Sequence, residues 1–176
     1  MQIRKIRESD ARAFLHLQKG LDRETTFMLL EPGERKESVA ETVQRIREIL
    51  AADNSTLLLA EDRGELVGFL AAFGGRVRRN GHVVSLVVGI RQAWTGRGIG
   101  TRLLEAVEAW ARQQGIHRME LTVMTHNERA LALYQKAGFQ IEGTRRDALR
   151  VENTYVDEYD MSKLLVEERG NVEQNG

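Results

Sequence analysis

The chain contains no cysteine and only one proline, and aromatic residues make up 6% of it. Without cysteine there are no disulfide bonds, no thiolate metal ligands and no cysteine nucleophile, so a covalent acyl-enzyme would need another residue. Charge of one sign is not in excess either, since 26 Lys and Arg residues balance 26 Asp and Glu residues. The chain therefore lacks the basic surplus of a general nucleic-acid binder, and we expect no nucleic-acid partner.

Long apolar runs are also absent. The first ten residues, MQIRKIRESD, have no apolar core of a signal peptide. No run approaches the roughly 20 apolar residues that a membrane-spanning helix needs. We therefore expect a cytoplasmic protein with no membrane partner. The four histidines, His16, His82, His117 and His126, share no zinc-site spacing, and we predict no metal.

A chain of 176 residues suits one domain with a sizeable core. Hydrophobic periodicity, capping residues and turn signals predict its elements. The expected strands are 2–6, 56–60, 66–73, 82–90, 116–124, 139–150 and 155–164; the expected helices are 10–20, 38–52, 99–115 and 127–138. This order, β-α-α-β-β-β-α-β-α-β-β, predicts an α/β sandwich with a mixed sheet and not a doubly wound one. We predict one domain over residues 1–166 and a polar C-terminal tail over 167–176.

The stretch VVGIRQAWTGRGIGTRLL joins an apolar strand to a helix through three glycines at alternate positions, Gly96, Gly98 and Gly100. Glycine permits positive φ and close approach of a ligand. Converging N–H groups and a helix N-terminus attract an anion. The pattern therefore indicates a phosphate cradle, with an ordinary flexible loop as the alternative. The Walker and Rossmann motifs are excluded because their glycine spacing is not met.

The glycine turn and the later segment NERALALYQKAGF together resemble the GNAT superfamily, the Gcn5-related N-acetyltransferases. The family motif [QR]-x-x-G-x-[GA] aligns with residues 95–100, with Thr95 where the family has Gln or Arg. The signature N-x-x-A-x-x-x-Y-x-K-x-G-F aligns with residues 127–139. The resemblance covers roughly residues 1–165 and implies a three-layer sandwich of about seven strands and four helices. The closing segment is similar to bacterial relatives that act on free amino acids or on protein N-termini.

The resemblance implies acetyl-CoA as the cofactor and assigns residues to it. The edge of residues 88–90 would pair with the pantetheine arm, residues 97–101 would wrap the pyrophosphate, and Lys136 would reach a phosphate. Asn127 would meet the pantetheine, with helix capping as its other role. The implied cofactor-binding residues are Val88, Gly89, Ile90, Thr95, Gly96, Arg97, Gly98, Ile99, Gly100, Thr101, Asn127, Tyr134 and Lys136.

Amide formation from a thioester needs a neutral amine and a route for charge onto the departing sulfur. The resemblance implies direct attack in a ternary complex, which agrees with the missing cysteine. Tyr134 would point at the sulfur and protonate it as general acid; a half-buried structural tyrosine is the alternative. A backbone N–H within residues 88–90 would hold the oxyanion.

The general base is not evident from the residues. The strand before the glycine turn holds no carboxylate, and Glu120 on the next strand is one candidate. By resemblance Glu31 and Glu34 border the acceptor and would bind an ammonium or deprotonate it; solvated loop carboxylates are the alternative. Tyr155 and Asp157, in the last hairpin, are weaker acceptor-side candidates.

We therefore expect an acetyl-CoA-dependent N-acetyltransferase whose acceptor is a small-molecule amine, an amino acid or a protein N-terminus. A non-catalytic acyl-CoA-binding sensor module is the first alternative, because the strand carboxylate is missing and Thr95 departs from the motif. A phosphate-loop enzyme unrelated to acetyl transfer is the second. Many members of the family dimerise, so a homodimer is compatible with the resemblance.

Overall fold

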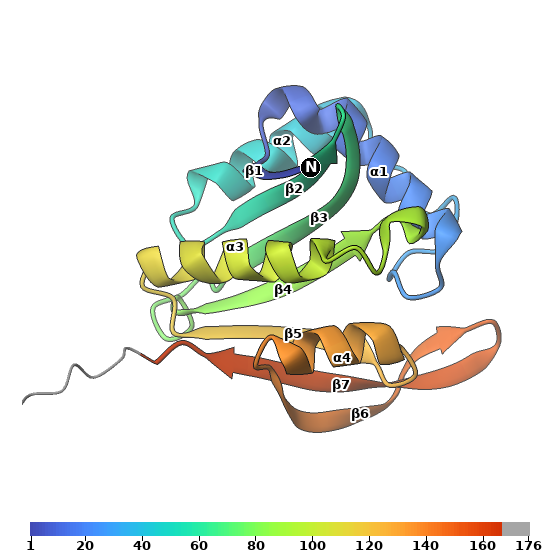
Figure 1. Ribbon diagram of the computed structural model, residues 1–176, viewed down its shortest axis with the longest axis vertical. Helices are drawn as coiled ribbons and strands as arrows, with labels where there is room; N and C mark the ends of the chain where they lie inside the picture. The colour runs from blue at the N-terminus through green and yellow to red at the C-terminus, as the bar shows by residue number, and fades with distance from the viewer. Residues whose placement is uncertain (167–176) are drawn as a thin grey trace, which may run out of the picture.

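The computed structural model describes residues 1–166, and the predicted tail lies outside the described residues. Seven strands form one sheet in the order β1-β2-β3-β4-β5-β7-β6, with four α-helices against it (Figure 1). The strands are β1 (Gln2–Lys5), β2 (Thr56–Asp62), β3 (Glu65–Gly74), β4 (Val83–Ile90), β5 (Arg118–Met124), β6 (Gln140–Val151) and β7 (Thr154–Leu164). The helices are α1 (Ala11–Glu24), α2 (Val39–Ala51), α3 (Ile99–Gln113) and α4 (Glu128–Lys136), with short 3-10 helices η1 (Glu8–Asp10) and η2 (Gln92–Trp94). The predicted mixed α/β sandwich is confirmed.

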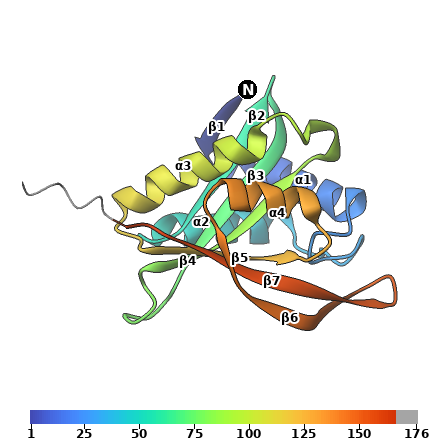
Figure 2. The same ribbon diagram turned by 60° about the horizontal axis from the view of Figure 1, so that its bottom comes forward.

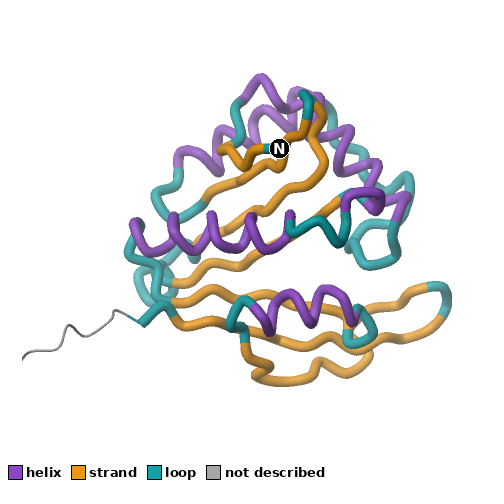
Figure 3. The backbone as a smooth tube through the Cα atoms, viewed as in Figure 1, coloured by secondary structure: helices purple, strands orange, loops and turns teal. Residues whose placement is uncertain are grey.

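The only parallel pair in the described sheet is the one between β4 and β5. Its register covers just three positions, from Val83 opposite Arg118 to Ser85 opposite Glu120. Past Ser85 the two strands are no longer paired, although both continue to their ends. The tube in Figure 3 follows the two halves of the sheet as they separate there. The sheet is therefore split internally at the carboxyl ends of β4 and β5.

Two apolar cores cover the two faces of the sheet. On one face α3 and α4 pack against alternate strand residues such as Leu70, Val84 and Leu121. On the other face α1 and α2 pack against the intervening residues, including Leu57, Leu59 and Phe69. This alternation is the period-two pattern of a sheet buried on both faces. Figure 2 shows α3 and α4 on the same side of the sheet, as the first core requires.

Helix α1 does not end at Gly20, where the glycine had predicted its end; it continues to Glu24. Leu17 and Leu21 are each 1% exposed and stand one turn apart on the core face. Glycine inside a helix costs about 1 kcal/mol relative to alanine, whereas burial of a leucine side chain contributes about 1.5–3 kcal/mol. Burial of Leu21 therefore outweighs the glycine, and α1 reaches one further turn toward the open end of β4.

Helix caps follow the sequence signals at two other places. Ser38 and Glu41 form the predicted capping box at the start of α2. Asn127 caps α4, its side-chain oxygen accepting a hydrogen bond from the Ala130 N–H at 3.3 Å. Within residues 1–166 no helix is both long enough and apolar enough to cross a membrane.

Candidate active site

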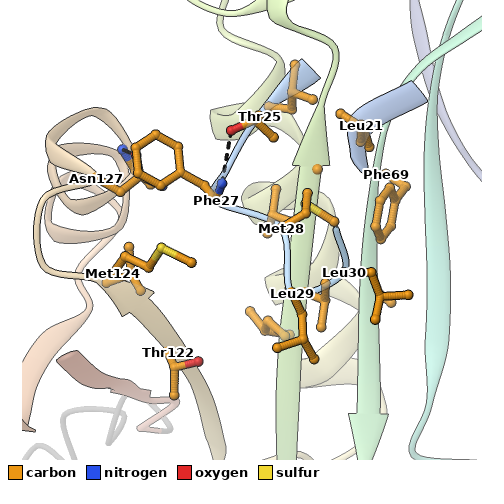
Figure 4. Close-up of a pocket in the computed structure, with 18 of the residues that line it drawn as sticks. Leu21, Thr25, Phe27, Met28, Leu29, Leu30, Phe69, Thr122, Met124 and Asn127 are labelled. Carbon is orange, nitrogen blue, oxygen red and sulfur yellow. Dashed lines mark hydrogen bonds between the residues drawn. The ribbon is translucent and has the colours of Figure 1, made fainter. Parts of the chain in front are cut away.

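A cavity of about 980 Å³ lies where β4 and β5 part. Its walls come from α1, the segment between α1 and α2, the ends of β3, β4 and β5, helix α4 and the β6–β7 hairpin. Figure 4 shows part of it, with Leu21 and Phe69 on one side and Met124 and Asn127 on the other. The cavity therefore passes through the split in the sheet, from the α3–α4 face to the α1–α2 face.

The backbone of β4 supplies hydrogen-bond donors to this split. The Arg91 N–H donates to Val67 O at 2.9 Å. This bond shows which residues of β4 direct their backbone groups toward β3. Because donors alternate along an antiparallel ladder, Gly89 bonds toward β3 while Val88 and Ile90 point their N–H and C=O groups the other way. No β5 residue pairs with β4 beyond Ser85. Two backbone N–H groups of the predicted edge, 88–90, thus face the split.

The glycine turn presents a second set of donors at the start of α3. Gly96 and Gly98 have φ of 75° and 76°, the left-handed region that favours glycine. The first bond of the helix runs from Arg102 N–H to Gly98 O at 3.1 Å, so the N–H groups of residues 99–101 have no partner inside the helix. No side chain caps this end. The donor set therefore fits a bound phosphate group.

The third glycine of the turn has a different reason. A Cβ on Gly100 would lie 2.6 Å from Leu133 Cδ2, so glycine here lets α3 start close against α4. Leu133 also lines the cavity. Gly100 therefore acts through packing and not through positive φ.

Positive charge near the turn comes from Arg129, a residue that neither sequence motif includes as a fixed position. Its Nη1 donates to Thr95 Oγ1, and both residues line the cavity. The Arg97 guanidinium instead stacks over the Trp94 ring at 4.6 Å. Lys136 is exposed in the last turn of α4 and does not line the cavity. The signal that could have selected Arg129 is its position two residues after the capping Asn127, in the first turn of a helix that borders the split.

Tyr134 is 8% exposed and lines the cavity from α4. Burial raises the pKa of its phenol to about 12, since desolvation disfavours the phenolate. The phenol therefore keeps its proton throughout the physiological pH range. It is a hydrogen-bond donor beside the split and not a base.

The segment between α1 and α2 closes the opposite side of the cavity with apolar side chains. The Phe27 N–H donates to Thr25 Oγ1 at 3.1 Å. The centre of the Phe27 ring lies 5.2 Å from that of His126, a residue of the loop between β5 and α4. Figure 4 shows Phe27, Met28, Leu29 and Leu30 along this wall. The wall spans the two halves of the split sheet. A molecule that enters the cavity from this side therefore contacts apolar side chains first.

The acceptor-side residues predicted from the sequence lie away from the cavity lining. Glu31 and Glu34 are exposed, and Glu34 Oε2 accepts from Glu31 N–H at 2.6 Å, which stabilises the turn itself. Tyr155 is 64% exposed near the hairpin tip. Asp157 Oδ1 accepts from the Asp147 N–H at 2.8 Å. Glu120 bonds to Ser85 and Arg118 at the paired end of β4 and β5.

Two other carboxylates do line the cavity, Glu24 and Glu158. Glu24 is engaged, because it accepts from Arg91 Nε at 2.6 Å and from the Gln92 N–H at 2.9 Å. Glu158 is half-buried on β7, opposite Met124 of β5. Among residues 1–166, no three His, Asp or Glu side chains gather as a metal site would require.

The model of the acetyltransferase (GNAT) family matches residues 20–139, from the second half of α1 to the residue before β6. This range holds the glycine turn, the split between β4 and β5, and Tyr134. The chain belongs to the GNAT family. GNAT proteins are acetyl-CoA-dependent acyltransferases, which agrees with the predicted cofactor and enzyme class.

Two curated relatives agree with this GNAT assignment. The chain is 32% identical over 105 residues to the L-amino acid N-acetyltransferase AaaT of Escherichia coli K12, a match of 57% of this chain and 63% of that protein. It is 36% identical over 115 residues to the N-alpha-acetyltransferase RimI of Mycobacterium tuberculosis, a match of 65% of this chain and 69% of that protein. The chain thus spans less than two thirds of the first relative. The predicted resemblance to amino-acid and N-terminal acetyltransferases is confirmed.

Solved GNAT structures share the whole fold. An acetyltransferase of the GNAT family from Streptococcus pneumoniae superposes with a TM-score of 0.91 at 31% identity, covering 93% of this chain and 99% of that one. The acetyltransferase yncA from Salmonella typhimurium, solved with its cofactor acetyl-CoA, superposes with a TM-score of 0.84 at 20% identity, covering 95% of each chain. The overall fold of the chain is therefore that of solved GNAT structures.

Proposed function

We propose that this protein transfers the acetyl group of acetyl-CoA to a primary amine by direct attack within a ternary complex. One observation carries the proposal. The same cavity is lined by the unpaired edge of β4 and by Tyr134. On the other face of the sheet it is lined by the apolar wall of residues 27–30, which we assign to the acceptor and call the acceptor-side wall. Donor and acceptor can therefore meet at the split without a covalent acyl-enzyme.

Residues on the α3–α4 side would hold the cofactor. The free N–H groups of residues 99–101 and the turn of Gly96 and Gly98 would receive the pyrophosphate. Arg129, held beside Thr95, would add positive charge next to the position where the family motif has Gln or Arg. Val88 and Ile90 would hydrogen-bond the amides of the pantetheine arm as a neighbouring strand does.

The reaction needs two proton transfers at this site. The acceptor nitrogen forms a bond to the carbonyl carbon, the carbon–sulfur bond breaks, the nitrogen loses a proton and the sulfur gains one. A backbone N–H of Val88 or Ile90 would hydrogen-bond the developing oxyanion. Tyr134 would hydrogen-bond the departing sulfur and pass it a proton. Because a thiol has a pKa of about 8.5, that transfer from a phenol of pKa about 12 runs uphill and must occur together with carbon–sulfur cleavage.

Tyr134→Phe tests this role, since it removes only the hydroxyl from a buried ring. We expect kcat to fall about 10²–10⁴-fold, the usual contribution of general acid catalysis, while the Kd for coenzyme A measured by calorimetry stays within about twofold. Thermal unfolding reports whether the variant remains folded. Unchanged turnover across the pH range would remove Tyr134 from the mechanism.

The pH profile gives an independent check. The raised pKa keeps Tyr134 protonated up to about pH 11, so kcat/KM should rise as the acceptor amine loses its proton and should not fall below pH 10. A fall centred near pH 8–9 in the wild type that disappears in Tyr134→Phe would contradict the pKa assignment. Binding of acetyl-CoA with no release of coenzyme A for any amine would favour a sensor module and overturn the proposed reaction.

A further inference from the structure

A row of residues crosses the sheet at the level of the split. Phe69 of β3 is opposite Gly89 of β4, Met124 of β5 is opposite Glu158 of β7, and Glu158 is opposite Arg145 of β6. Continuing the parallel register of β4 and β5 sets Gly89 across the split from Met124. Directly opposed residues project on the same face of a sheet. Since Phe69 packs in the α1–α2 core, the row lies on that face, where the acceptor-side wall is.

Two opposite charges end this row. Glu158 and Arg145 both line the cavity and are cross-strand neighbours, yet their charged ends do not pair within 4.0 Å. In the part of the chain that the structure describes, the Glu158 carboxylate has no ion-pair partner, and the Arg145 Nε lies 3.5 Å from Asp160 Oδ2. A carboxylate and a guanidinium thus stand side by side, one strand away from the β5 edge of the split.

Arg145 makes only the exposed 3.5 Å contact to Asp160, whereas the other charged groups of this wall are held in pairs with two hydrogen bonds each. Arg35 makes two hydrogen bonds to the buried Asp22, at 2.8 and 3.1 Å. Arg45 makes two to Glu37, at 2.9 and 2.8 Å. These pairs stabilise the segment between α1 and α2 and leave it with an apolar surface. A ligand with one positive and one negative group would therefore find its oppositely charged partners in Glu158 and Arg145.

We propose that Glu158 and Arg145 form the head-group subsite for a free α-amino acid with an apolar side chain. This inference rests on the proposed acetyl transfer. Glu158 would receive the ammonium group, Arg145 the carboxylate, and the wall of residues 27–30 the side chain. An α-amino acid carries both charges on one carbon, which suits two long side chains whose Cβ atoms lie about 5 Å apart across a strand pair.

The assignment also identifies the group that accepts the first proton from the substrate ammonium. The ammonium nitrogen gives one proton to Glu158, directly or through a water, and the neutral nitrogen then forms the bond to the acetyl carbon. The second proton leaves the nitrogen after attack and passes, directly or through a water, to the Tyr134 phenolate, which has given its own proton to the sulfur. Glu158 releases the first proton to solvent. The atoms balance without any further reactant.

The test compares L-leucine, L-leucine methyl ester and a leucine-initiated tripeptide as acceptors, by continuous detection of the released thiol. The ester keeps the amine and the side chain but has no carboxylate, and the tripeptide carries its carboxylate two residues away. The variants are Arg145→Met and Glu158→Gln. Arg146→Met and Glu152→Gln are matched controls, because both residues are exposed and lie outside the cavity lining.

We expect Arg145→Met to raise KM for L-leucine by about 10–100-fold, the effect of losing a charge-assisted hydrogen bond, and to leave KM for the ester unchanged. Glu158→Gln should lower kcat/KM about tenfold or more for all three acceptors. The Kd for coenzyme A should stay the same in every variant. The controls should match the wild type.

Three results would overturn the subsite. The first is a wild type that acetylates the ester or the tripeptide as well as it acetylates L-leucine. The second is Arg145→Met changing KM for the ester as much as for L-leucine. Activity on other amines with none on free amino acids would also reject it, while leaving acetyl transfer intact. No thiol release with any amine would instead reject acetyl transfer itself, so the two failures are distinguishable.

Discussion

Gly89 lies beside the split, in contact with the α1–α2 core. Replacing it tests how closely the side chains of this core pack against β4. A Cβ at this position would lie 2.7 Å from both Leu21 Cδ1 and Phe69 Cε1. Optimal carbon–carbon contact is about 3.5–4.0 Å, so each neighbour would have to move by about 1 Å. Both side chains are buried, and the Phe69 ring packs edge-on against Phe14 at 5.3 Å, so moving either one disturbs the packing of the α1–α2 core.

We therefore expect Gly89→Ala to lower the free energy of unfolding by about 1–3 kcal/mol, the usual cost of overpacking a core. For a domain of this size 1 kcal/mol corresponds to roughly 2–4 °C in Tm, so the expected fall is about 2–12 °C. Urea unfolding followed by circular dichroism measures the free energy, and calorimetry measures Tm.

Gly143→Ala is the matched control. Gly143 lies in β6 without positive φ, and a Cβ there would meet no atom within 4 Å. Alanine should be neutral or stabilise by up to about 1 kcal/mol, because it narrows the unfolded ensemble. Equal unfolding free energies for the two variants would refute the packing argument at Gly89.

Two further substitutions test the anion site and the acid stability. Arg129→Met should raise the Kd for coenzyme A by about tenfold at low salt and reduce its salt dependence, since it removes an exposed cation; Arg97→Met should change it less, because Arg97 stacks on Trp94, and equal effects would contradict this. Hydrogen bonds from Arg4 lower the pKa of Asp10 below 3.8, so its stabilisation is present above pH 4 and is lost as the pH falls through the folded-state pKa. Asp10→Asn should therefore cost about 1 kcal/mol at pH 7 and much less at pH 2 in urea unfolding; an equal cost at both pH values would exclude the ion pair as its cause.

The order of the elements and the glycine turn were predictable because they depend on local patterns. Two-residue and 3.6-residue periods separate strands from helices. The left-handed φ of Gly96 and Gly98 is a demand that only glycine meets easily, so it is visible in the sequence. The end of α1 was wrong because a local signal, Gly20, competed with the burial of Leu21, which depends on tertiary packing.

The acceptor side was less predictable because it is made by register between distant segments. Glu158 and Asp157 are neighbours in the sequence, yet only Glu158 projects into the cavity, since successive residues of a strand face opposite sides. Arg129 meets Thr95 only because α4 packs against the start of α3. Glu31 and Glu34 were expected beside the acceptor by resemblance; in the structure the Glu34 carboxylate accepts a hydrogen bond from the Glu31 backbone N–H, and neither residue lines the cavity.

The split sheet links stability to function in this fold. Where β4 leaves β5, Val88 and Ile90 lose the strand partner that would satisfy their backbone groups, and an unpaired buried group costs about 1–3 kcal/mol. A short parallel pair of three positions is what remains, and helices on both faces hold the separated strands in place. The backbone groups of Val88 and Ile90 regain hydrogen-bond partners only when a ligand with its own amides lies along β4. We infer that coenzyme A should therefore raise Tm more than an equal concentration of a ligand that contacts only the start of α3, such as inorganic pyrophosphate, and that Arg129→Met should weaken but not abolish the stabilisation by coenzyme A.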